Sequence, residues 1–468
     1  MNFWDYDAWT IVLQLGIILT SIIICNIIRR KIKFIRNSLL PTSVLAGLLI
    51  FIINFIPAVN NYINRDLMEM LTYHCLGLGF IALALKTNQI KKDHNKLVIV
   101  DTGLITVNGY LIQGIVGLTL SLVLSFTIFP SLFHAAGLLL PMGFGQGTGQ
   151  ALNFGKIYEG LGFENGATFG LSIAAIGFLI ACIIGVIYLN VLKRKGRLKV
   201  QEERIANNGL STDDIYAEDE APLNEAVDKL TIQFAVVFLV YLITYFVIFG
   251  LSYLSERFLG NFGTNTLKPL FWGFNFLFGS LFAFIIKKIL VALKNKKIMK
   301  HTYVNNYMLN RLSGFFFDIM IVAGIAAIDW NNLSGLLWPL LIICAFGAFA
   351  TFVYVRFICH KVYPEYEHEA FFSMFGMLTG TASTGMILLR EIDPNFETPA
   401  AQNLVLQQVP AIAFGFPVIL LVSFAGKDLT SSLITLAIIV PMFVGYNVFL
   451  LRKYIFKKKE KKIDINNK

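Results

Sequence analysis

The sequence predicts an all-α polytopic membrane protein with about 11 transmembrane helices and two re-entrant, discontinuous segments, arranged as two inverted-topology repeats. Hydrophobic residues make up 56% of the 468-residue chain and charged residues only 15%, which is too little polar surface for a soluble globule. Apolar runs of roughly 20 residues, the length that crosses a bilayer, recur along the chain. Two glycine-rich segments, Gly143–Gln150 and Gly376–Gly385, interrupt this apolar pattern at matching places.

The apolar runs give the predicted spans in chain order. Each is long enough for one helix to cross the hydrocarbon layer. The runs begin near Trp9, Leu39, Met70, Val98, Ala167, Leu230, Lys268, Leu312, Leu336, Leu404 and Ser431.

Basic clusters between the spans predict the orientation, because cytoplasmic loops carry an excess of Lys and Arg. One cluster follows the first span, another follows the third, and the loop between them carries only Arg65. We therefore expect the N-terminus outside and the basic tail around Lys457–Lys462 in the cytoplasm. The clusters are Arg29, Arg30, Lys31, Lys33 and Arg36, then Lys86, Lys91, Lys92 and Lys96.

The polar stretch from Lys193 to Lys229 divides the chain into halves, and the phase of the basic loops reverses after it. The same order of elements with opposite loop charge predicts inverted repeats. We expect an N-terminal repeat (1–192) with an external re-entrant loop, a cytoplasmic linker (193–229), an inverted repeat (230–428) with a cytoplasmic re-entrant loop, and a last helix with its tail (429–468).

The glycine-rich segments are the predicted transport site. Irregular backbone survives at membrane depth only inside protein or beside a watery cavity, and paired interruptions of this kind mark the substrate and ion site of secondary transporters. Unwound carbonyls and hydroxyls suit Na⁺, and exposed N–H groups at a broken helix start suit a carboxylate. The alternative is that small residues merely permit close helix packing. Predicted substrate residues are Gly145, Gln146, Gly147, Thr148, Gly149, Gln150, Gly380, Thr381, Ser383 and Thr384, and predicted Na⁺ ligands are Thr148, Asn153, Thr379 and Thr381.

Ionisable residues inside spans are costly, so each needs a partner or a cavity. Asp318 is a further candidate Na⁺ ligand, with a structural role as the alternative. Arg390 is a candidate partner of a substrate carboxylate, although it also suits an interfacial position or pairing with Glu391 or Asp393. Asp101 lies close to a basic loop, which favours an interfacial position.

At these residues the chain resembles the bacterial sodium/glutamate symporter family (glutamate:Na⁺ symporter, ESS type), as a divergent subgroup. The matching motifs are Gly145-Gln146-Gly147-Thr148-Gly149 and Gly380-Thr381-Ala382-Ser383-Thr384, and the order of spans fits nearly the whole chain. The departures are Phe144 in place of the first glycine, Gln146 at the family's loop histidine, and the Leu388-Leu389-Arg390 ending.

The resemblance implies sodium-driven uptake of an anionic amino acid such as glutamate by a homodimer, with Na⁺ as the coupling ion and no other cofactor. The alternatives are Na⁺- or H⁺-coupled transport of another carboxylate, such as a dicarboxylate or a different amino acid. An ion channel is a further rival, but it normally repeats one filter around an axis. An intramembrane protease would need paired Asp residues, or a Ser with a His, at a common depth. Neither glycine-rich segment contains Asp or His, so we expect no enzyme.

Overall fold

A computed structural model describes residues 2–56, 62–86, 96–196, 228–299, 304–333, 335–393 and 397–452. Every regular element in these ranges is helical, and ten of the helices are long and apolar enough to cross a membrane. The predicted all-α polytopic fold is confirmed. Lys91, Lys92, most of the predicted linker and the tail around Lys457–Lys462 lie outside the described residues.

The predicted span near Leu39 is shorter than expected. Leu39 adopts a left-handed backbone with φ of 59° and Pro41 follows it, so the helix begins only at Thr42. The resulting helix α3 (Thr42–Ile53) has 12 residues. Its length of about 18 Å falls short of the roughly 30 Å hydrocarbon layer. The other predicted runs coincide with the long helices.

The chain folds into two compact units, and each unit takes helices from both halves of the sequence. Unit 1 lies within Met1–Ser21, Gly47–Ile90 and Ile205–Ala327, and unit 2 comprises the rest. Besides the first part of α1 (Tyr6–Lys31) and most of α3, unit 1 contains α5 (Arg65–Leu85), α10 (Lys229–Phe262), η3 (Gly263–Leu267), α11 (Lys268–Gly273), α12 (Asn275–Asn295) and α13 (Asn306–Ala326).

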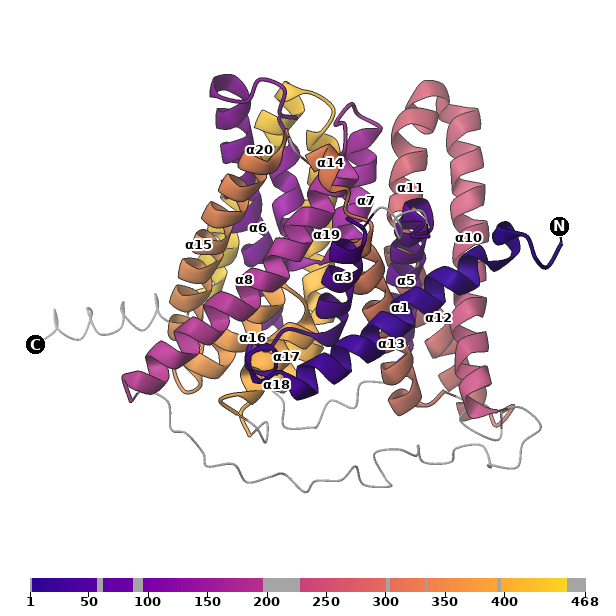
Figure 1. The fold of residues 1–468 in the computed structure, drawn as a ribbon, viewed down its shortest axis with the longest axis horizontal. Coiled ribbons are helices and arrows are strands. Elements are labelled where there is room, and N and C mark those ends of the chain that lie inside the picture. Colours follow the sequence, from indigo (N-terminus) through magenta and orange to yellow (C-terminus); the bar gives the residue numbers. More distant parts are fainter. Residues whose placement is uncertain are drawn as a thin grey trace, which may run out of the picture. The chain divides into compact units, whose positions relative to one another are not determined.

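Helix α5 is the centre of unit 1, where α10, α12 and α13 pack against it (Figure 1). Its glycines permit the close approach: a Cβ on Gly79 would lie 2.6 Å from the Phe317 ring of α13. Ser313 of α13 also donates a hydrogen bond to the Gly79 carbonyl at 3.1 Å. Small residues at such crossings let helices approach closely where no hydrophobic effect drives association.

Unit 2 contains the remaining helices, including both glycine-rich segments. They are the second part of α1, α2 (Lys33–Asn37), α6 (Lys96–Thr127), η1 (Ala136–Leu138), η2 (Pro141–Gly145), α7 (Thr148–Glu159), α8 (Gly166–Arg194), α14 (Trp330–Leu333), α15 (Leu337–Val362), α16 (Glu367–Thr379), α17 (Ala382–Arg390), α18 (Ala400–Leu406), α19 (Gln408–Ala425) and α20 (Leu429–Leu450).

The long helix α6 organises unit 2, since α15, α19 and α20 all pack along it (Figure 1). Near its start, the Asp101 carboxylate accepts hydrogen bonds from both terminal nitrogens of Arg452, at 2.7 and 3.1 Å. The Arg452 guanidinium also lies over the Phe449 ring, 4.1 Å from its centroid. This bidentate pair neutralises the buried Asp101 carboxylate and joins the end of α20 to α6.

Candidate functional site

The first glycine-rich segment forms a broken helical hairpin, hairpin 1, made of η1, η2 and α7. The chain enters through η1 and the single π-helical turn η2, breaks at Gln146 and Gly147, and returns along α7. Phe133 before the hairpin stacks on Phe163 after it, with ring centroids 5.1 Å apart. Hairpin 1 therefore begins and ends at the same end of unit 2.

The break in hairpin 1 depends on Gly147. Its φ of 82° and ψ of −171° lie in a region that is essentially restricted to glycine. Backbone hydrogen bonds flank it, from Gly147 N to Gly143 O at 3.2 Å and from Ala151 N to Gly147 O at 3.1 Å. Because Gly147 has no side chain, no side-chain hydrogen bond caps the start of α7, and the N–H groups of its first turn, from Thr148 to Gln150, lie at the tip of the hairpin.

The second glycine-rich segment forms hairpin 2, in which α16 and α17 run back along each other. A Cβ on Gly376 would lie only 2.7 Å from Gly385 Cα, and a Cβ on Gly385 would overlap the Ser373 carbonyl. The chain turns at Gly380, with φ of −146° and ψ of −105°, and at extended Thr381. The glycines are thus required for the two arms to touch, as the close-packing alternative also proposes.

The tips of the two hairpins adjoin each other. A Cβ on Gly147 would lie 3.8 Å from Thr381 Cγ2 and 4.0 Å from Gly380 O. Helix α8 lies against both tips, because a Cβ on Gly177 would lie 2.6 Å from Thr379 O and 2.9 Å from the Phe144 ring. Unit 2 therefore holds both interruptions around a common point.

The electrostatics of this point arise from helix ends. The N-termini of α7 and α17 carry partial positive charge, and the C-terminus of α16 carries partial negative charge. No acidic or basic residue occurs in either glycine-rich segment. The two tips thus combine N–H donors that suit an anion with carbonyl acceptors that suit a cation.

The predicted side chains differ in exposure. Gln146 and Thr381 are partly exposed and Ser383 is exposed, so these polar groups at the tips are accessible. Gln150 is 1% exposed, and neither atom of its amide has a hydrogen-bond partner among the described residues. The other predicted residues near the tips are buried: Gly145, Thr148, Gly149, Asn153, Thr379 and Thr384.

Arg390 lies at the far end of its own helix from the tip of hairpin 2. It ends α17, and nine residues of helix from Thr381 separate it from the tip by about 13 Å. It is exposed there, so the geometry favours the interfacial position over contact with a substrate at the tips. Asp318 is exposed on α13, which belongs to unit 1.

Sequence reasoning missed Gln113 of α6, which is fully buried and contacts hairpin 2. Its Nε2 donates to Leu378 O at 2.8 Å and to Thr351 Oγ1 at 3.0 Å. A Cβ on Gly145 would lie 3.3 Å from its Oε1. The only signal in the sequence is an amide within an otherwise apolar run.

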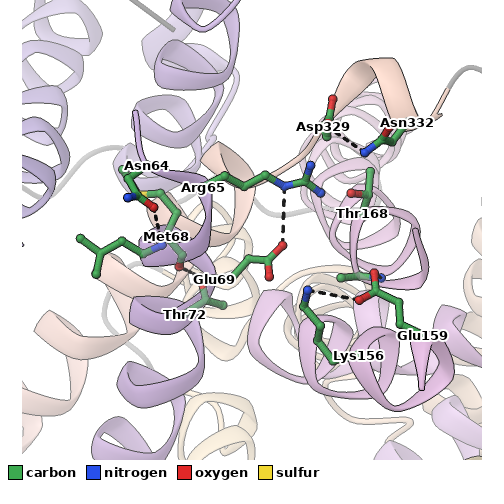
Figure 2. A network of polar contacts seen from close by, with 12 residues as sticks. Asn64, Arg65, Met68, Glu69, Thr72, Lys156, Glu159, Thr168, Asp329 and Asn332 are labelled. Carbon is green, nitrogen blue, oxygen red and sulfur yellow. Dashed lines mark hydrogen bonds and ion pairs between the residues drawn. The ribbon is translucent and has the colours of Figure 1, made fainter. Parts of the chain in front are cut away.

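Polar contacts lie at the roots of both hairpins, where α7 ends and α16 begins. On α7, Lys156 Nζ pairs with Glu159 Oε2 at 3.2 Å, and Glu159 Oε1 accepts a hydrogen bond from Ala167 N of α8 at 3.0 Å (Figure 2). The same view shows the separate Arg65–Glu69 pair on α5 of unit 1, at 3.6 Å.

At the root of hairpin 2, Glu367 contacts three basic side chains. Arg356 Nη2 lies 3.1 Å from Glu367 Oε1, His360 bonds to Oε2, and His368 Nε2 lies 3.5 Å from Oε1. Burial raises the pKa of Glu367, but hydrogen bonds from His360 and Arg356 outweigh it and hold the pKa below the ordinary value. The carboxylate at the start of α16 is therefore stabilised in its charged form.

We expect this contact to make stability depend on pH. A carboxylate with a depressed folded pKa stabilises the fold above its unfolded pKa, about 4.3, and this contribution is lost as pH falls through the folded pKa. Glu367→Gln should therefore melt below the wild type at pH 7, and the difference should disappear in acid. Melting of both proteins in detergent from pH 7 to 3.5 measures it, and a constant difference would contradict the assignment. Burial raises the pKa of Glu369 in both proteins, so the comparison cancels that part of the pH dependence.

Comparison with known proteins agrees with this architecture. A family model described as sodium/glutamate symporter matches residues 8–398, a range that includes both hairpins. No curated protein matches the chain. The matched range covers well over half of the chain, which confirms the resemblance seen in the glycine-rich motifs. The chain, a multi-pass membrane protein, belongs to the sodium/glutamate symporter family.

Proposed function

We propose that this protein takes up glutamate, or a closely related anionic amino acid, together with Na⁺ by alternating access. The observation that carries the proposal is the meeting of two broken hairpins, with Gly147 of one beside Gly380 and Thr381 of the other. Such a meeting point offers unwound backbone to a solute inside the membrane, where regular helices offer none. Family membership supports the same reading.

The substrate carboxylate binds at the starts of α7 and α17 in this proposal. The first turn of α7, which no N-cap side chain closes, and the positive end of its helix dipole favour an anion. The buried amide of Gln150 and the exposed hydroxyl of Ser383 are available for the polar groups of the substrate. A buried amide without a hydrogen-bond partner costs free energy, and a polar substrate would recover that cost whereas an aliphatic one would not.

The coupling Na⁺ binds to hydroxyls and carbonyls of the tips. Thr148, Asn153, Thr379 and Thr381 come from the two adjoining segments, and neutral oxygens permit the release that transport requires. Asp318, on α13 of unit 1, is kept as a separate candidate for an ion or structural role. The charge pattern of the loops supports an N-terminus outside and a cytoplasmic C-terminus. The family resemblance suggests a bacterial inner-membrane location and a homodimer.

Uptake into proteoliposomes tests the proposal. Labelled glutamate should accumulate under an imposed Na⁺ gradient. Among unlabelled amino acids and dicarboxylates, those closest to glutamate should reduce this uptake most. If accumulation follows a proton gradient instead, H⁺ and not Na⁺ is the coupling ion. If a different carboxylate competes more strongly than glutamate, that carboxylate is the substrate. Conduction down any permeant gradient, without accumulation, would instead identify a channel.

Thr148→Val and Thr381→Val should each raise the half-saturating Na⁺ concentration of uptake by about tenfold, equivalent to about 1.4 kcal/mol. Each change removes one oxygen while preserving volume and branching at Cβ. Thr381→Val also removes the N-cap bond from Thr384 N, which is 3.4 Å long. Thr148→Ser and Thr381→Ser keep the hydroxyls and serve as controls. Unchanged Na⁺ dependence in both valine variants would remove these hydroxyls from the mechanism.

A further inference from the structure

The amide of Gln113 has an orientation that its neighbours determine. Leu378 O is only an acceptor, and Thr351 Oγ1 already donates to Gly347 O at 2.7 Å, so it too accepts. Both partners therefore require Nε2 on their side of the amide, at 2.8 and 3.0 Å. The two N–H groups of Gln113 are both used, and Oε1 points away from these partners.

The oxygen of Gln113 is left without a donor. Gln113 is 0% exposed, and no hydrogen-bond partner of Oε1 occurs among the described residues. A Cβ on Gly145 would lie 3.3 Å from this oxygen, so Oε1 is adjacent to the last residue of η2, directly before the break in hairpin 1. A buried amide oxygen without a donor costs free energy, which a bound cation or donor would recover.

We propose that Gln113 Oε1 is a ligand of the coupling cation at the break of hairpin 1, an inference that rests on the proposed Na⁺-coupled function. A lone acceptor repels a substrate carboxylate and attracts a cation. Because the same planar amide donates to Leu378 in the last turn of α16, cation binding at hairpin 1 also orders the tip of hairpin 2. Gln113 thereby links ion binding to both moving elements of the site.

The structure favours this residue over others that are also buried. Asn108 of α6 is also buried, but its amide lies beside Tyr354 of α15, whose hydroxyl bonds to Asn447 of α20. Gln407, between α18 and α19, also contacts hairpin 2, but both ends of its amide are satisfied, since it accepts from Thr106 at 2.9 Å and donates to Met377 Sδ at 3.2 Å. Gln113 combines a contact to hairpin 2 with an amide oxygen that has no donor among the described residues.

Na⁺ binding to the purified full-length protein, without substrate, tests the inference. The melting temperature in detergent is titrated with NaCl against choline chloride at constant ionic strength. Gln113→Leu and the unbranched Gln113→Met remove the amide oxygen at similar volume, and Thr351→Val removes only one acceptor of Nε2. We expect both Gln113 variants to raise the half-saturating Na⁺ concentration at least tenfold, and Thr351→Val to change it less than twofold.

The outcomes separate this inference from the proposed function. A wild type whose melting does not respond to Na⁺ contradicts both. A responsive wild type with Gln113 variants of unchanged Na⁺ affinity overturns the role of Gln113 alone. A second titration, with glutamate at saturating Na⁺, tests whether Oε1 binds the ammonium group of the substrate instead. If the Gln113 variants change only the glutamate affinity, Oε1 binds that ammonium and the Na⁺ assignment is wrong. Gln113→Met gives the same readout if Gln113→Leu does not fold.

Discussion

Replacing Gly147 with alanine should reduce Na⁺-driven uptake by about tenfold to a hundredfold while the protein still inserts and folds. A Cβ at Gly147 meets only ordinary contacts, at 3.8 and 4.0 Å, so the effect is conformational rather than steric. The backbone region of φ 82° and ψ −171° costs a non-glycine residue about 1–3 kcal/mol. Since about 1.4 kcal/mol corresponds to a factor of ten, this strain shifts the tip out of the geometry that binds the substrate.

Gly162→Ala is the matched control for this experiment. Gly162 also has a positive φ, of 100°, but it lies in the turn between α7 and α8 with no atom within 4 Å of an added Cβ. The substitution imposes comparable backbone strain away from the tips. Uptake per folded molecule should stay near the wild-type value for Gly162→Ala and fall for Gly147→Ala. Equal losses in both variants would mean that backbone strain beside the root of hairpin 1 limits transport as much as strain at its tip.

The largest effect on stability is expected from Gly117→Ala in α6. The backbones of Gly117 and Gly137 are in direct contact where α6 crosses η1, and a Cβ on either would overlap the carbonyl of the other. Because backbone cannot swing aside as a side chain can, α6 and η1 must separate. Overpacking of this kind costs about 1–3 kcal/mol and at times more. We expect a clear fall in melting temperature in detergent, with loss of monodisperse protein during size-exclusion chromatography.

Gly114→Ala provides the comparison for Gly117→Ala. It lies one turn earlier on α6, and a Cβ there would meet Leu138 Cδ2 at 3.5 Å, an ordinary contact. Alanine in a helix interior is favoured over glycine by about 0.5–1 kcal/mol. Gly114→Ala should therefore match or exceed the wild-type melting temperature. If both variants melt alike, the Gly117–Gly137 crossing does not determine the stability of unit 2.

The sequence predicts the framework of this protein because bilayer crossing imposes a simple rule on composition and length. The spans and both interruptions follow from runs of apolar residues and from glycine density. The short α3 could not be predicted from hydropathy alone. Its start depends on the left-handed backbone at Leu39 and on Pro41, neither of which a hydropathy profile registers.

The candidate site is predictable only in part, because its contacts join distant positions. Gln113 pairs with Thr351 and Leu378, which lie 238 and 265 residues further along the chain. A single glutamine in an apolar run carries no sign of those partners. Arg390 shows how sequence proximity differs from spatial proximity: it follows the second motif closely in the chain, but the rise of α17 places it about 13 Å from the tip.

The composition of unit 1 has a consequence for biosynthesis. Helix α5 ends at Leu85, whereas its partner α13 ends at Ala326, so 326 − 85 = 241 residues must be translated before the pair is complete. At roughly 5–20 residues per second this takes about 12–48 s. During that interval the surface of α5 around Gly79 lacks the Phe317 ring and the Ser313 hydroxyl that contact it in the folded protein. The early helices of unit 1 therefore wait in the membrane for late partners, and unit 1 completes its packing only after most of the chain has been made.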